Sequence, residues 1–157
     1  MKIRRLYPGS FGANCWLLCS RDGQAAVVDP SPDAGTVSDA LREEGAKPSV
    51  ILLTHGHFDH ILSLDTLRDA TGIPALIHRD DLGFPNDARK NAFEVFFHQR
   101  RVWRTPDGTF RDGRFLRELL KEKLPKYMIP KNIIFIDEMP MTVNGKLDRK
   151  KLEGMLA

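Results

Sequence analysis

The sequence is poor in the features that would place it in a membrane or an oxidising compartment. No apolar run approaches the roughly 20 residues that a membrane-spanning helix needs. Residues 1–5 are followed by no apolar stretch of the signal-peptide type, so we expect a cytoplasmic location and no membrane contact. Cysteine is scarce, with only Cys15 and Cys19. On one strand they would share a face but lie about 13 Å apart, too far for a disulfide, which predicts two reduced core thiols.

The sequence also lacks a strong charge of either sign. Its formal net charge is +3, and the excess falls in residues 106–157. Basic residues are not interleaved with aromatics as on a nucleic-acid surface, so we expect no nucleic-acid partner. An apolar fraction of 41% and a charged fraction of 29% are typical of a globular protein. A chain of 157 residues makes one domain or two very small ones.

Strand and helix signals alternate along the first hundred residues. Apolar runs bounded by turn residues predict strands, amphipathic spacing predicts helices, and Gly45 and Gly72 would end the two helices. The predicted strands are 3–7, 15–19, 25–28, 50–53 and 75–77, and the predicted helices are 34–44 and 61–70. Residues 91–97 fit a short helix or a short strand. This order predicts an α/β fold with its site at the carboxyl ends of strands.

A dense group of metal-binding residue types follows the predicted strand 50–53. His55, His57, Asp59 and His60 lie within six residues. One histidine would be better explained as a surface residue, but buried polar groups need partners, and packing does not explain four together. Neutral imidazole and carboxylate are ligands for zinc. We therefore predict these four residues as ligands of one or two divalent ions, with Gly56 allowing close backbone packing.

This H-x-H-x-D-H string resembles the signature of the metallo-β-lactamase-fold hydrolases. The runs 11–18 and 27–30 look like the first strands of the hydroxyacylglutathione-hydrolase-like branch, and the resemblance covers about residues 1–106. It implies a zinc centre in which Asp59 binds metal and helps orient the nucleophile. It also implies that Asp29 supports the ligands from behind as a second shell. A small-molecule thioester or ester would be the substrate.

The chain departs from that family because the later histidines of its site have no counterpart. Only His78 and His98 remain, and neither matches the missing motif. We expect His78, at a strand end, to make a local polar contact and His98 to be no ligand. The resemblance therefore implies an incomplete site with weak or no turnover.

The end of the chain resembles a different family. Residues 124–130 and 141–150 look like the last motifs of the acyl- and amino-acid-adenylating enzymes, such as D-alanyl carrier protein ligases. The resemblance covers about residues 109–155, and Lys146, after Asn144 and Gly145, matches the lysine of that family's mobile lid. The nucleotide-binding core is missing. We expect the apolar residues of 115–124 and 133–136 to cover apolar surface of the front part, with Lys146 exposed.

The sequence thus predicts a chimera: a metallo-β-lactamase-like N-terminal half at 1–106 and an adenylation-lid-like segment at 107–157. Its fold class would be α/β, with partial metallo-β-lactamase-like sheet-and-helix layers and a small α+β tail. A zinc-dependent hydrolase-like protein is the first hypothesis. A non-enzymatic metal-binding fold with a packing tail is the second, and a remnant lid of an amino-acid-activating ligase is the third. The sequence does not determine the oligomeric state.

Overall fold

The structure is a computed structural model that describes residues 2–6, 11 and 13–111, with the single residues 117, 120, 121, 129, 150, 151 and 154. The apolar stretch 133–136 and Lys146 lie outside the described residues. Of the apolar stretch 115–124, residues 117, 120 and 121 are described and helical.

The described residues form a single mixed sheet of six strands that lie side by side in chain order. The strands are β1 (Lys2–Leu6), β2 (Cys15–Cys19), β3 (Gln24–Val28), β4 (Lys47–Leu52), β5 (Ala75–His78) and β6 (Gly108–Phe110). β1, β2 and β3 pair antiparallel. β3, β4, β5 and β6 pair parallel. The carboxyl ends of β3 and β4 therefore meet at one edge of the sheet, as expected for an α/β fold.

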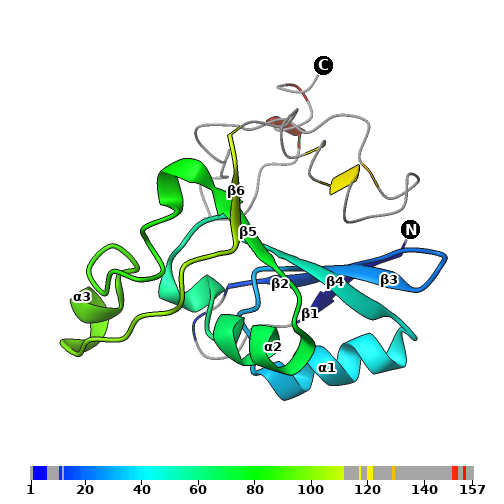
Figure 1. Ribbon diagram of the computed structural model, residues 1–157, viewed down its shortest axis with the longest axis horizontal. Coiled ribbons are helices and arrows are strands. Elements are labelled where there is room, and N and C mark those ends of the chain that lie inside the picture. The colour runs from blue at the N-terminus through cyan, green and yellow to red at the C-terminus, as the bar shows by residue number, and fades with distance from the viewer. Residues whose placement is uncertain are drawn as a thin grey trace.

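Helices α1 (Ala34–Glu43) and α2 (Leu64–Thr71) lie on the same face of this sheet (Figure 1). Asp33 caps α1 by accepting from the backbone N–H of Thr36 at 2.9 Å. Gly72 ends α2 in the left-handed conformation. Two short 3₁₀ turns, η1 (Phe58–His60) and η2 (Arg79–Asp81), and the short helix α3 (Phe93–Phe97) complete the elements. The predicted α/β fold class is confirmed.

Each face of the sheet carries a separate apolar cluster. The alternation along β2 turns Cys15, Leu17 and Cys19 inward, toward the face covered by α1 and α2. Both cysteines are buried free thiols, as predicted. The opposite face buries Ala26, Val50, Leu76 and Phe110 together with Leu120, which is 3% exposed and comes from the predicted tail. At least one tail residue therefore packs against the sheet.

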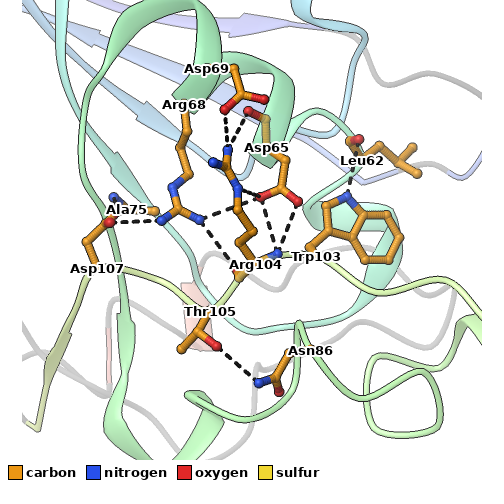
Figure 2. Close-up of polar contacts among 10 residues, drawn as sticks. All are labelled: Leu62, Asp65, Arg68, Asp69, Ala75, Asn86, Trp103, Arg104, Thr105 and Asp107. Carbon is orange, nitrogen blue, oxygen red and sulfur yellow. Dashed lines mark hydrogen bonds and ion pairs between the residues drawn. The ribbon is translucent and has the colours of Figure 1, made fainter.

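A polar network holds the segment before β6 against α2 and β5 (Figure 2). Arg104 donates to the main-chain oxygen of Asp65 at 3.0 Å and to the carboxylate of Asp69 at 2.7 Å. Asp107 accepts from the guanidinium of Arg68 and from the backbone N–H of Ala75, both at 2.8 Å. This network positions β6, which begins just beyond the predicted boundary at 106, as a strand of the same sheet.

Further hydrogen bonds hold residues 103–105 in place. Trp103 is 4% exposed and its indole N–H donates to the carbonyl of Leu62 at 3.4 Å. Asn86 donates to the hydroxyl of Thr105 at 3.0 Å. Residues 103–107 are thus irregular chain anchored along α2. The division at 106–107 stays a prediction.

Most predicted elements match the observed ones, but β4 begins at Lys47 where the sequence predicts residue 50, and α2 begins later than predicted. The sequence predicts a helix from residue 61, whereas α2 begins at Leu64. The hydroxyl of Ser63 donates to the carbonyl of Pro30 at 3.0 Å and so makes no cap for α2. Among the described residues, no helix combines the length and apolarity that crossing a membrane requires.

Candidate metal centre

The predicted ligands follow β4 at the edge where the parallel strands end. Leu53, just after β4, is buried and its N–H donates to Leu76 O at 2.9 Å. β3 ends beside β4, and the N–H of Asp29 donates to Leu52 O at 3.0 Å. This pairing places Asp29 next to Thr54, the first residue of the motif.

Asp29 is the buried centre of the hydrogen bonding around the motif. It is 3% exposed and adopts a left-handed φ of 48°. Its carboxylate accepts from the N–H of Thr54 at 2.8 Å and from the hydroxyl of Thr54 at 2.6 Å. Its Oδ2 also lies 2.9 Å from Nδ1 of His60. Because a carboxylate only accepts, Nδ1 of His60 carries a proton, and in the neutral ring the Nε2 lone pair is free.

Hydrogen bonding also determines which ring nitrogen of His55 carries the proton. Thr54 Oγ1 lies 3.1 Å from Nδ1 of His55. Since the single hydroxyl proton of Thr54 goes to Asp29, Thr54 accepts from His55, which puts that proton on Nδ1. Nε2 of His55 then carries the free lone pair. Asp29 and Thr54 therefore prepare two histidines to bind an ion through Nε2, as outer partners do in metal sites.

The environment gives these two histidines opposite pKa shifts. Burial, followed by the neighbouring charges of His60 and His57, lowers the pKa of His55 to about 4. His55 is thus neutral near pH 7, which is the form that binds metal. Burial also acts to lower the pKa of His60, but the hydrogen bond and charge of Asp29 and the charge of Asp59 outweigh it and raise that pKa.

The four predicted ligands lie close together. The rings of His55 and His57 are 4.6 Å apart between centroids, and those of His55 and His60 are 4.1 Å apart. Nε2 of His60 lies 3.7 Å from Oδ2 of Asp59. The structure therefore brings all four side chains to one end of β4.

The next loop packs tightly over the motif at Gly56. A Cβ added to Gly56 would lie 2.4 Å from the Cβ of Phe84 and 3.0 Å from Cδ of Pro85. The Phe84 ring also stands 6.2 Å from the ring of His57. The backbone carbonyl of Asn91 accepts from the N–H of Phe58 at 2.9 Å. Gly56 thus permits the close backbone approach predicted from the sequence.

The donor chemistry suits a divalent ion of the zinc class, but the donors do not converge on one point. Among the described residues, no three His, Cys, Asp or Glu side chains are arranged to hold an ion together. A catalytic zinc usually has three protein ligands and one open position. The motif therefore provides neighbouring donors, with at most two of them at any one point.

Neither remaining histidine adds a donor within the described part of the chain. Nε2 of His78 lies 2.7 Å from the carbonyl of Arg111, and its ring packs against Phe110. His78 thus makes the predicted local polar contact. His98 is exposed and caps the end of α3 with a φ of 53°. The lid-like Lys146 lies outside the described residues.

Sequence reasoning missed three residues that shape the site. Thr54 orients His55, Phe84 packs on Gly56, and Asn91 binds the motif backbone. Thr54 stands at the start of the motif, so its position was a usable signal. Phe84 and Asn91 lie in a loop without periodicity, and nothing local connects them with the histidines.

Known proteins resemble the chain mainly through its front part. The family model described as "Metallo-beta-lactamase superfamily" matches residues 8–131. "Probable metallo-hydrolase YqgX" of Bacillus subtilis (strain 168) is 38% identical over 91 residues, which is 58% of this chain and 43% of that protein. This chain therefore spans less than half the length of that relative.

Solved structures support the same fold. The "BLEG-1 B3 metallo-beta-lactamase" aligns with a TM-score of 0.65 and 29% identity, over 69% of this chain and 53% of that one. "TTHA1623 in a di-iron-bound form" aligns with a TM-score of 0.55 and 22% identity, over 69% and 52%, and shows the fold alone.

A further match is shorter and is to an acyl-activating enzyme. "Probable acyl-activating enzyme 4" of Arabidopsis thaliana is 48% identical over 42 residues, which is 27% of this chain and 8% of that protein. Such a stretch fits the expected adenylation-like tail without reaching the size of a domain. The family model, by contrast, spans most of the chain, so the protein belongs to the metallo-beta-lactamase superfamily.

Proposed function

We propose that this chain is a metal-dependent, hydrolase-like protein of the thioester- or ester-cleaving type, with weak or no turnover. The observation that carries the proposal is the Asp29–Thr54 network, which leaves Nε2 free in the neutral forms of His55 and His60. The buried carboxylate of Asp29 is costly without partners, and orientation of ligands is a physical reason for keeping it.

Four residues would hold the ion or ions. His55 and His57 would form one pair, and Asp59 and His60 would form the other; the two pairs are neighbours, because the rings of His55 and His60 are 4.1 Å apart. Zinc is the first choice for imidazole and carboxylate donors. When bound, such an ion supplies a Lewis acid toward a carbonyl oxygen. Asp59 would also orient the nucleophile, and Asp29 would keep the His60 ring from turning.

We expect weak turnover because the four predicted donors would act as two pairs and not as one set of three. Two protein donors at a point bind an ion less firmly than three and leave its position less defined. The described residues offer no further donor to either pair. This same observation favours the second hypothesis, a metal-binding protein without catalysis, as the alternative.

Metal content tests the proposal directly. We expect about one zinc per purified full-length chain by elemental analysis, and a clear loss in the His57→Ala variant. His98→Ala is the matched control because His98 is exposed and lies outside the motif. Protein free of metal, or equal metal in His57→Ala and the control, would overturn the metal-binding proposal.

Hydrolysis tests the remaining part. With a simple thioester and a thiol-detecting dye, we expect a rate close to the uncatalysed background. A substantial rate that a chelator and His57→Ala both abolish would contradict weak turnover and show that other residues complete the site. His78 and His98 would then be the first residues to substitute.

A further inference from the structure

The segment 83–103 is held rigidly next to the metal motif. The side chain of Asn91 is fully buried and donates to the carbonyls of Pro85 at 3.2 Å and Arg101 at 3.0 Å. It also accepts from the N–H of Phe93 at 2.9 Å. These bonds close the segment into a loop before any ligand arrives. A surface on this loop is therefore pre-organised, which lowers the entropic cost of binding.

The loop exposes an unusual amount of apolar surface. On α3, Val95 is 63% exposed and Phe96 is 68% exposed. Their neighbour Phe97 packs edge-to-face on Phe58 at 5.5 Å and on Phe11 at 5.6 Å. Phe58 lies inside the metal motif and is buried, so α3 packs against the motif through this ring. Contiguous exposed apolar residues of this kind mark binding surfaces.

Two hollows adjoin this apolar surface. One, of about 320 Å³, is lined by Arg89, Glu94, Val95 and His98. The other, of about 570 Å³, shares Arg89 and Glu94 and adds the cations Lys90 and Arg100. Val95 lines the smaller hollow, and the two hollows share Arg89 and Glu94. The apolar surface of α3 is therefore next to the polar lining of these hollows.

The charge available in the larger hollow is positive. Asp87 accepts from the N–H groups of Arg89 and Lys90, and Glu94 lies 3.4 Å from the guanidinium of Arg89. Glu94 is thus paired with Arg89, whereas Asp87 keeps its charge: the backbone N–H groups of Lys90 and Arg89, and then the charges of Lys90 and Arg100, lower its pKa. Lys90 and Arg100 form no side-chain hydrogen bond or ion pair with another residue in the described part of the chain. Three cations against two carboxylates leave the lining with one net positive charge for an anion from outside.

We infer that this surface binds a single-chain anionic amphiphile, a fatty carboxylate or a molecule of the same chemistry. Its apolar chain lies along Val95 and Phe96, and its anionic group enters the hollow of Lys90 and Arg100. An extended chain matches this surface because Val95 lines the smaller hollow, which is joined to the hollow of Lys90 and Arg100 through Arg89 and Glu94. This binding does not require hydrolysis, so it stands or fails separately from the proposed function.

A calorimetric titration of the full chain with dodecanoate, below its micelle concentration, tests the inference. We expect saturable binding, at least about tenfold weaker for octanoate because fewer methylenes are buried. Phe96→Ser should weaken dodecanoate binding about tenfold. The double variant Lys90→Gln/Arg100→Gln should weaken it about fivefold.

Matched controls come from the other end of the molecule. Ile3→Ser removes an exposed apolar residue from β1, and Arg21→Gln/Lys47→Gln removes two exposed cations. Both should bind dodecanoate as the unmodified chain does. Equal loss in controls and test variants, or no saturable binding, would overturn the inference.

Three further outcomes would also overturn it. If the cationic amphiphile dodecyltrimethylammonium bound as tightly as dodecanoate, Lys90 and Arg100 would have no role in binding the anionic group. Phe96-dependent sedimentation with phosphatidylglycerol-containing vesicles would assign the surface to a lipid bilayer. A concentration-dependent dimer that Phe96→Ser dissociates would assign it to a second copy of the chain.

Discussion

Substituting Gly56 by alanine tests whether the loop after η2 closes directly onto the metal motif. Gly56 lies between His55 and His57 and opposes the backbone of Phe84. An added Cβ would sit 2.4 Å from the Cβ of Phe84, well inside the contact distance of two carbons. Neither atom can move by side-chain rotation, so the backbone must shift.

The magnitude follows from two opposing contributions. Overpacking of a tight contact costs about 1–3 kcal/mol. Alanine also restricts the unfolded chain, which offsets about 0.4–1 kcal/mol of that cost. We expect Gly56→Ala to lower the free energy of unfolding by about 1–2 kcal/mol. In a chain of this size the midpoint of thermal unfolding would fall by about 2–8 °C.

Gly83→Ala is the matched control for this measurement. Gly83 lies in the same loop, has no left-handed φ, and a Cβ there would meet nothing within 4 Å. Gly83→Ala therefore changes stability only by restricting the unfolded chain. We expect its midpoint of thermal unfolding to equal or slightly exceed that of the unmodified chain. Circular dichroism melts of the three proteins give the difference. If Gly56→Ala and Gly83→Ala melt together, the close approach at Phe84 is wrong.

Three more predictions concern the core and the tail. Cys15 and Cys19 should resist iodoacetamide at mildly alkaline pH and react once unfolded, because both are buried and burial raises the pKa of Cys15 to about 12. Mass spectrometry reads the labelling, and rapid labelling of Cys15 in the native protein would contradict its burial. Leu120→Ala should destabilise the fold by about 2–4 kcal/mol in urea unfolding, since Leu120 packs on the sheet; an unchanged midpoint would separate the tail from this core. Lys146→Ala should leave unfolding and any thioester hydrolysis unchanged, and a loss of either would give that lysine a role.

The sheet could be predicted where an apolar run stands between turn residues. β2 is predicted to the residue because its apolar run, 15–19, is bounded by Asn14 and Ser20. Its neighbours β1 and β3, and β5 further along the sheet, are predicted within one residue at their ends. The three-residue β6 gives no such signal, because its pairing with β5 depends on Asp107 and Arg68, which are distant in sequence.

The metal motif could be predicted because its donors are adjacent in sequence. Local spacing alone brings His55, His57, Asp59 and His60 to one turn. The contact of Asp29 with His60 joins residues 31 apart, and it was expected only from the family resemblance. The loop residue Asn91 could not be predicted at all, because its partners are backbone carbonyls and any sequence supplies those.

The first strand has a consequence for how the folded protein behaves at high concentration. β1 is an edge strand within the described residues, and an edge strand can template pairing with another chain. It carries Lys2, Arg4 and Arg5, of which Lys2 and Arg4 pair with Glu44 at the end of α1. Two copies meeting edge to edge along β1 would bring these cations together. The cationic side chains of β1 therefore disfavour edge-to-edge self-association and aggregation.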